Sequence, residues 1–316
     1  MDLLNLIKSK VSIFEASDMY EGLEAVIHHI EIAERHFENG GQYDEYFYTD
    51  VIYRTNQAFE GALKEAYRSF AEADPSRKTP AQIEKYLESK ELLKERVLVQ
   101  FKNYRSEWRN KSTHDYKLFF SSQEALLAVV SVSAFCSILL DEMLEKHAYD
   151  TEISELSNKA GDIVVKLGNY HELEFHQQCL EILAHFSASH KRENNFKGKF
   201  NEFELRGKLA AYISTIDPEI SIQTEVPFAI GSRRAMVDII LKKGESGVII
   251  ELKRPSKESR LIAMKATQQV ASYLAVSGLT EGILYIPPYD KDSKVVITNE
   301  SYEFEDLKKN ISVIRA

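Results

Sequence analysis

The sequence predicts two domains, an all-α four-helix bundle followed by an α/β domain with a central mixed sheet. Three observations support this prediction. The chain has 316 residues, roughly twice the length of an ordinary domain. Apolar residues in the first half recur at intervals of three and four, the period of helices that bury one face. The second half instead contains short β-branched runs bounded by Gly, Pro, Lys and Asp, as strands usually are.

Composition indicates a folded protein without a secretory or zinc-binding signature. Apolar residues make up 44% and charged residues 28% of the chain, a balance typical of globular proteins. The N-terminus lacks the basic start and cleavage site of a secretory signal, and Cys136 and Cys179 are the only cysteines. We therefore expect a cytoplasmic protein without membrane association, disulfides or a cysteine zinc site. The net charge of −9 argues against non-specific coating of polyanions but allows a nuclease with a local basic cleft.

Residues 1–150 are expected to form the helical bundle. Its last helix begins with Ser121 and Glu124, which have the spacing of a capping box. It continues through Ala125–Leu140, 16 residues without a charge. Because a membrane span needs about 20 apolar residues, we interpret this stretch as a buried helix. The four helices are expected at about residues 20–37, 52–70, 97–110 and 121–147.

Residues 196–316 are expected to form the α/β domain, and residues 151–195 a polar connector with helical tendency. Helices are expected at about 201–216 and 258–277. The expected strands are Ser221–Val226, Met236–Leu241, Gly247–Leu252, Gly282–Ile286 and Val295–Thr298.

Two acids and a lysine are expected to converge at the ends of two adjacent strands. Asp238 lies within one apolar strand, and the next strand leads into Glu251 and Lys253. Because strand side chains alternate, Glu251 and Lys253 share one face. Carboxylates are suitable ligands for Mg²⁺, and a lysine beside the metal can position or deprotonate a water. The alternative is a buried ion pair of Glu251 with Lys253 or Arg254 in an unrelated α/β domain.

This arrangement resembles the PD-(D/E)xK nuclease superfamily over about Asn201 to Ile286, although Val237 stands where the family often has proline. The resemblance implies a restriction-endonuclease-like fold and hydrolysis of phosphodiester bonds, DNA being the expected substrate, with Mg²⁺ or Mn²⁺. It also implies that Asp238 and Glu251 bind the metal and that Lys253 is catalytic. Between residues 232 and 260, eight basic and four acidic residues give a charge of 8 − 4 = +4, as a phosphate-binding cleft requires.

In that superfamily a glutamate from the preceding helix completes the metal site, and several branches have a glutamine on the following helix. Glu202 shares an apolar stripe with Leu205, Leu209 and Ile213, so it is expected to face the sheet in preference to Glu204. Gln269, four residues before Tyr273, is favoured over Gln268 as the corresponding glutamine.

A second motif lies between the third and fourth predicted helices. Arg109, Asn110 and His114 combine a permanent cation with a group that titrates near neutral pH. The pattern resembles the HEPN superfamily over about Tyr20 to His147. This resemblance implies a homodimer that cleaves RNA without a metal, with His114 transferring protons, Arg109 stabilising charge and Asn110 helping to hold the site. Alternatively, His114 caps the next helix and Arg109 pairs with Asp115.

These resemblances predict a nuclease acting on DNA, RNA or both, by analogy in bacterial defence against foreign nucleic acid. Two alternatives are open. In the first, the HEPN-like domain is a non-catalytic dimerisation or sensing module that controls the PD-(D/E)xK nuclease. In the second, the chain is a non-enzymatic nucleic-acid-binding protein.

Overall fold

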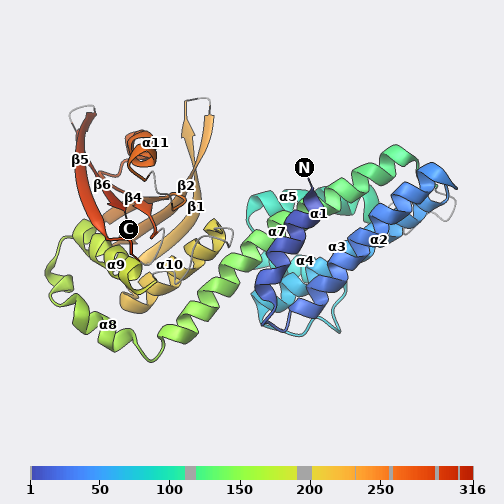
Figure 1. The fold of residues 1–316 in the computed structure, drawn as a ribbon, viewed down its shortest axis with the longest axis horizontal. Coiled ribbons are helices and arrows are strands. Elements are labelled where there is room, and N and C mark those ends of the chain that lie inside the picture. The colour runs from blue at the N-terminus through green and yellow to red at the C-terminus, as the bar shows by residue number, and fades with distance from the viewer. Residues whose placement is uncertain are drawn as a thin grey trace. The chain divides into compact units, whose positions relative to one another are not determined.

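The computed structural model describes residues 2–110, 119–190, 201–231, 233–255, 259–288, 292–304 and 307–315. The chain divides into two compact units, Met1–His147 and Ala148–Ala316. The first is helical and the second contains the sheet (Figure 1). The division falls within one long helix, which continues from the first unit into the second.

The described part of the first unit contains all four expected helices and two that were not expected. The unexpected helices are α1 (Leu3–Val11) and α4 (Pro80–Ser89). The expected helices are α2 (Tyr20–Gln42), α3 (Phe47–Ala71), α5 (Glu95–Tyr104) and α7 (Ser122–Leu156). A short 3₁₀ turn, η1 (Ser12–Phe14), and a π-helical turn, η2 (Arg105–Arg109), extend α1 and α5.

Aromatic side chains join three helices of this unit. Phe59 of α3 has its ring centroid 5.3 Å from that of Phe101 and 4.6 Å from that of Tyr104, both on α5. Its centroid is 5.0 Å from that of Phe135 on α7. Such pairs are favourable beyond the area they bury. The apolar stripes found in the sequence are therefore the surfaces at which these helices pack.

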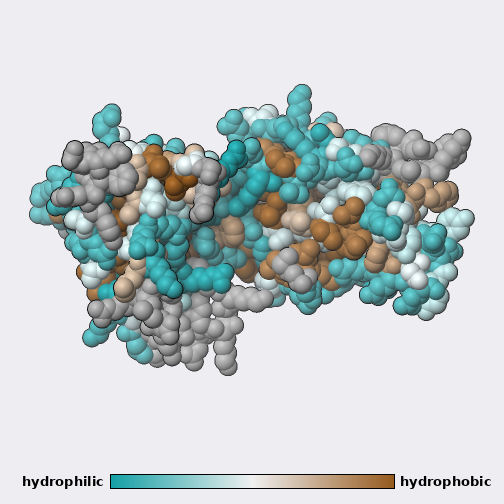
Figure 2. Space-filling view, turned by 90° about the horizontal axis from the view of Figure 1, so that it is seen from above, coloured by the Kyte–Doolittle hydropathy of each residue, from teal (hydrophilic) through white to brown (hydrophobic). Residues whose placement is uncertain are grey.

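Helix α7 begins at the predicted capping box. The Ser121 backbone N–H donates to Glu124 Oε2 at 2.9 Å, and the Glu124 N–H donates to Ser121 Oγ at 3.4 Å. Among the described helices, α7 alone is long and apolar enough to cross a membrane by length and composition, and 61% of its apolar window is buried within the protein. Leu126, Leu127 and Val130 are exposed, and Figure 2 shows apolar surface on the helical unit.

A mixed sheet forms the centre of the second unit, with the strand order β1-β2-β3-β4-β6-β5 among the described residues. Pairing is antiparallel from β1 to β3, parallel from β3 through β4 to β6, and antiparallel between β6 and β5. The strands are β1 (Ser221–Ile230), β2 (Arg233–Lys243), β3 (Ser246–Leu252), β4 (Glu281–Ile286), β5 (Val296–Phe304) and β6 (Leu307–Arg315). All five expected strands are present, and β6 was not expected.

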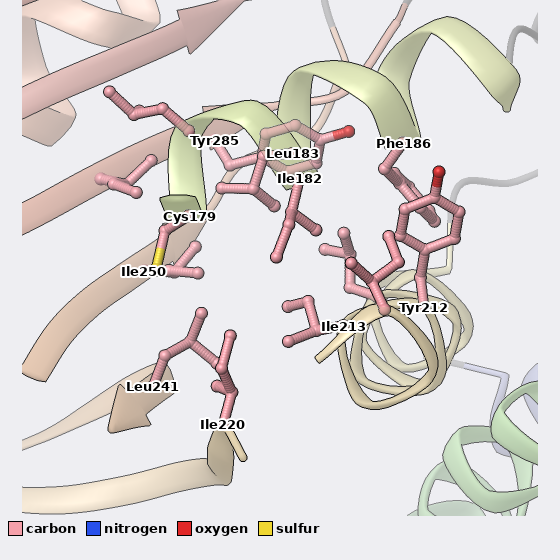
Figure 3. Close-up of a cluster of buried hydrophobic side chains, with 14 of the residues drawn as sticks. Cys179, Ile182, Leu183, Phe186, Tyr212, Ile213, Ile220, Leu241, Ile250 and Tyr285 are labelled. Carbon is pink, nitrogen blue, oxygen red and sulfur yellow. The ribbon is translucent and has the colours of Figure 1, made fainter. Parts of the chain in front are cut away.

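Helices cover both faces of the sheet. On one face, α9 (Phe175–Ser189) and α10 (Glu202–Ile216) bury apolar side chains against β2, β3 and β4 (Figures 1 and 3). On the other face lies α11 (Ser259–Ser277), which packs through Val270 and Leu274. The sheet is therefore shielded on both sides, as parallel pairing usually requires.

Much of the segment expected to be a connector belongs to the core of the second unit. It forms α8 (Ala160–Leu167), a 3₁₀ turn η3 (Tyr170–Glu172) and α9. The side chains of Leu183 and Phe186 on α9 are 0% and 2% exposed. They meet α10 and the sheet in the cluster of Figure 3.

Candidate active site

Asp238 and Glu251 stand opposite each other where β2 and β3 separate. Ile239 of β2 pairs with Ile250 of β3, so one further step along the antiparallel register brings Asp238 opposite Glu251. The Leu252 backbone N–H donates to Asp238 Oδ2 at 2.7 Å. The Glu251 residue is 3% exposed. Two acidic side chains are therefore held together by regular backbone, in a place that excludes most water.

Lys253 and Gln269 complete a chain of hydrogen bonds beside this pair. Lys253 Nζ lies 2.6 Å from Glu251 Oε1 and 3.1 Å from Gln269 Oε1. Gln269 Nε2 in turn donates to the Tyr273 hydroxyl at 2.5 Å, and that hydroxyl donates to the Met236 carbonyl at 3.1 Å. The lysine is thus positioned from β3 and α11 together. Gln268 is exposed, whereas Gln269 is half-buried.

Helix α10 brings Glu202 toward the acidic pair. The helix begins at Asn201, whose side chain accepts from the backbone N–H groups of Phe203 and Glu204, a typical N-cap. Glu204 lies 2.8 Å from Lys208 in an i,i+4 pair. Glu202 instead interacts electrostatically with Asp238, and its own charge raises the pKa of Glu251. Glu202, rather than Glu204, therefore lies within electrostatic range of the acidic pair.

Burial makes ionisation unfavourable for all three acids. It raises the pKa of Glu251 to about 7, and the charge of Asp238 adds to the rise while Lys253 opposes it. Burial also raises the pKa of Asp238, against the hydrogen bond from Leu252, and that of Glu202. Three neighbouring acids whose pKa values burial raises together are a pattern that occurs at functional sites.

The donor set fits a hard divalent cation. Glu251 Oε2 is buried and accepts no hydrogen bond from an N–H or hydroxyl group of the described residues, so this oxygen can accept a cation. Within the described ranges, no three His, Cys, Asp or Glu side chains form a ready-made metal cluster. Mg²⁺ is often held by one or two carboxylates together with waters and substrate phosphate. Asp238 and Glu251 meet that requirement.

Comparisons of this chain with protein-family models, with curated proteins and with solved structures give no match.

Some of the basic residues between 232 and 260 lie away from the acidic pair of Asp238 and Glu251. Lys242 and Lys243 are at the opposite end of β2, beside the turn to β3. There Lys243 Nζ lies 2.7 Å from Asp217 Oδ2 and 3.3 Å from Glu219 Oε2. Lys242 and Lys243 therefore contribute to the net charge of +4 between residues 232 and 260 without lying beside the acidic pair. We call Lys243, Asp217 and Glu219 the Lys243 cluster.

The Arg-Asn-x₃-His motif of the first unit lies partly within the described residues. Arg109 ends the π-helical turn η2, and its Nε is 3.1 Å from Glu60 Oε1 on α3. Asn110 is exposed, and its backbone N–H donates to the Arg105 carbonyl. His114 and Asp115 lie outside the described residues. The structure therefore places Arg109 and Asn110 together at the end of α5 and gives no position for the histidine.

Sequence reasoning missed three charged residues near the two sites. Glu60 was not recognised as a partner of Arg109, since the two are 49 positions apart. Arg206 and Glu225 were missed beside the acidic pair, where Arg206 Nη2 lies 3.4 Å from Glu225 Oε1. A signal for Arg206 was available, because a residue four positions after Glu202 lies on the same helical stripe. The sequence has no comparable signal for Glu225.

Proposed function

We propose that the second unit is a metal-dependent nuclease domain of the PD-(D/E)xK type, with a restriction-endonuclease-like fold, and that DNA is its substrate. The observation that carries the proposal is the buried pair of Asp238 and Glu251, with Lys253 held 2.6 Å from Glu251. An isolated structural ion pair would need one acid, and here two converge. The order of helix, hairpin, helix and strand from α10 to β4 supports the same proposal.

Asp238 and Glu251 would hold Mg²⁺ or Mn²⁺, with Glu202 close enough to add negative charge. A cation bound there would lower the pKa of a coordinated water and neutralise charge on the phosphate. Lys253 is held by Glu251 and Gln269, which leaves one of its three ammonium protons to donate to the attacking water or to a phosphate oxygen. The Tyr273 hydroxyl fixes Gln269 and so contributes to the orientation of the lysine.

Labelled DNA and RNA, incubated with the purified protein in Mg²⁺ or in EDTA, test this proposal. We expect DNA cleavage in Mg²⁺ and none in EDTA, with 5′-phosphate product ends from attack by water. Absence of Mg²⁺-dependent cleavage on every DNA tested would contradict the proposed function and favour a binding protein.

A second activity, metal-independent RNA cleavage by a HEPN-like first unit, is supported by the position of Arg109. Arg109 is the last residue of a π-helical turn, a distortion that is frequent at functional sites. In this proposal His114 transfers the proton of a ribose 2′-hydroxyl while Arg109 stabilises the phosphate, and two copies of the motif meet across a homodimer. Bacterial defence against foreign nucleic acid is the proposed setting, by analogy with the pairing of RNA- and DNA-directed modules.

RNA cleavage that survives EDTA and leaves 2′,3′-cyclic phosphate ends would support this second activity. RNA that remains intact in EDTA would contradict it. The first unit would then be proposed as a dimerisation or sensing module that controls the metal-dependent nuclease.

A further inference from the structure

Three neighbouring strands each bring one acid to the same level of the sheet. The β1–β2 pairs of Thr224 with Ile239 and of Val226 with Val237 place Glu225 at the level of Asp238, although these two acids are not themselves a paired position. The β2–β3 register, one step beyond the pair of Ile239 and Ile250, places Glu251 on the other side of Asp238. Directly opposite residues on adjacent strands are the closest cross-strand neighbours, and like charges there destabilise a sheet. A third acid at this level therefore requires an explanation beyond the proposed metal pair.

The backbone of Glu225 is strained. Its φ is +52°, in the left-handed region that side chains other than glycine rarely adopt. The residue lies inside β1, with Thr224 and Val226 both paired to β2 on either side of it. Such conformations are unfavourable for a side chain other than glycine and cluster at functional sites. The strain persists because the flanking strand pairs hold the position.

Glu225 is the ion-pair partner of a fully buried cation. Arg206, on α10, is 0% exposed, and its Nη2 lies 3.4 Å from Glu225 Oε1. The guanidinium also stands over the ring of Phe203, with its central carbon 4.8 Å from the ring centroid. A buried cation is costly unless a carboxylate compensates it. Glu225, whose side chain is 8% exposed, supplies that compensation.

Arg206 also lies within electrostatic reach of the proposed metal site. Its charge acts on both Glu202 and Asp238, and Glu202 is one helical turn away on the same stripe. If Glu225 lost its charge, these two carboxylates would be the next partners for the buried guanidinium. A carboxylate held by arginine presents fewer lone pairs to a metal.

We infer that Glu225 is a positioning residue that engages Arg206, so that Glu202 and Asp238 remain available to a divalent cation. The inference rests on the proposed metal site and adds a role for β1 to it. The strained backbone of Glu225 is explained as the geometry that turns its carboxylate toward α10 and Arg206.

Mn²⁺ binding to the full-length protein, measured by titration calorimetry, tests this role without requiring nuclease activity. Glu225→Gln should weaken Mn²⁺ affinity by about tenfold or more, as loss of a residue that supports a metal ligand typically does. Glu225→Gly should weaken it similarly while relieving the strain at φ +52°, so it provides a folded variant if Glu225→Gln is unstable. Glu219→Gln, the same chemical change at an exposed acid of the Lys243 cluster, should leave Mn²⁺ affinity unchanged.

The double variant Glu225→Gln with Arg206→Met separates positioning from other roles. Removing the guanidinium as well removes the cation that Glu225 had engaged and leaves Lys253 acting on Glu202 and Asp238 as in the wild type, so the double variant should regain most of the lost affinity. A purely structural role for Glu225 predicts equal or greater weakening in the double variant, and that result would overturn the inference.

The remaining outcomes distinguish the inference from the proposed function. Unchanged Mn²⁺ affinity in Glu225→Gln and Glu225→Gly overturns the inference and leaves the nuclease proposal intact. Failure of the wild-type protein to bind Mn²⁺ overturns both the metal site and the inference. The expected pattern of affinities in a protein that cleaves no DNA supports the inference and overturns the nuclease proposal.

Discussion

A buried acid lies beside each end of the β2–β3 hairpin, and the two acids are compensated differently. Asp217, at the end of α10, lies beside the turn, and Glu251 lies at the other end, on β3. Beside the turn, Asp217 accepts hydrogen bonds from Lys243 Nζ at 2.7 Å and from the Tyr170 hydroxyl at 2.8 Å. Burial opposes its ionisation, but these hydrogen bonds outweigh burial and lower its pKa. At the end of the hairpin away from the turn, which we call the open end, burial raises the pKa of Glu251 to about 7, although Lys253 is 2.6 Å away.

At this hairpin the direction of the pKa shift follows the partners of each acid, which favour the charged form of Asp217 and leave burial dominant at Glu251. Asp217 has a complete set of partners and stabilises the fold as an anion. Glu251 faces a second acid and has one oxygen that accepts no hydrogen bond from an N–H or hydroxyl group of the described residues. A lysine beside a buried acid does not by itself indicate a closed ion pair, because both ends of the hairpin have one.

The largest expected difference between the ends is in catalysis. Lys253→Met should reduce Mg²⁺-dependent DNA cleavage on the order of 10³-fold, the scale of losing one donor positioned on a reacting group. Lys243→Met is the matched control, because the same substitution at the turn should lower stability and leave cleavage near wild type. Rates under saturating DNA, with circular dichroism to check folding, measure both. Equal loss of cleavage in the two variants would contradict the division between the ends.

The second prediction concerns the Arg-Asn-x₃-His motif of the first unit, where RNA cleavage is proposed to need no metal. His114→Ala and Arg109→Ala should each reduce EDTA-resistant RNA cleavage by about 10²-fold or more, the contribution of a proton-transferring group. Neither should alter DNA cleavage in Mg²⁺. The assay is quantification of 2′,3′-cyclic phosphate ends, and recovery of activity on mixing the two variants would show that one site needs both chains of a dimer. Cyclic-phosphate release at the wild-type rate in His114→Ala would exclude the motif as its source.

The raised pKa of Glu251 predicts that the metal-free protein becomes more stable as the pH falls. The folded state takes up a proton near pH 7, whereas the unfolded carboxyl takes it up near its ordinary value of about 4.3. Between these values, protonation favours the folded state, by up to about 3 kcal/mol. Urea unfolding in EDTA should show this gain between pH 8 and pH 5 relative to Glu251→Gln, which lacks the titrating group. A difference in the free energy of unfolding between the two proteins that stays constant from pH 8 to pH 5 would contradict this prediction.

The lowered pKa of Asp217 predicts the opposite sign and a smaller effect. At neutral pH, Asp217→Asn should lower the free energy of unfolding by about 2 kcal/mol, the value of hydrogen bonds to a charged group. The contribution is present above the ordinary aspartate pKa of about 3.9 and is lost as the pH falls through the lower folded value. The free energies of unfolding of wild type and Asp217→Asn should therefore become equal below about pH 4. Glu219→Gln, an exposed acid near the same lysine, is the control and should change stability little.

The sequence was sufficient to predict the elements that carry the acidic pair. Apolar runs on either side of Asp238 and before Glu251 define buried strands, and alternation then places Glu251 and Lys253 on one face, as their contact confirms. The strand β6 escaped prediction because Lys308, Lys309 and Asn310 interrupt its apolar pattern. It pairs with both β4 and β5, and this pairing compensates for its weak local signal.

Interactions between distant segments could not be predicted in the same way. The contact of Arg206 with Glu225 joins a helix to a strand, and the left-handed backbone of Glu225 has no signature in a residue type that normally avoids it. The segment at 151–195 is polar on average, yet Cys179, Leu183 and Phe186 lie on one buried helical stripe. The average polarity of the segment hides this stripe, whereas the spacing of its apolar residues at three and four positions indicates it.

Glu251→Gln and Asp217→Asn can be compared in two measurements on the same samples, DNA cleavage in Mg²⁺ and urea unfolding at neutral pH in EDTA. We expect the two variants to show opposite effects in these measurements. Glu251→Gln should lose cleavage and be at least as stable as wild type, because it removes a charge that burial disfavours. Asp217→Asn should keep cleavage and lose stability. A Glu251→Gln protein that cleaves DNA at the wild-type rate, or that unfolds more easily while Asp217→Asn does not, would contradict the assignment of the open end as the active site.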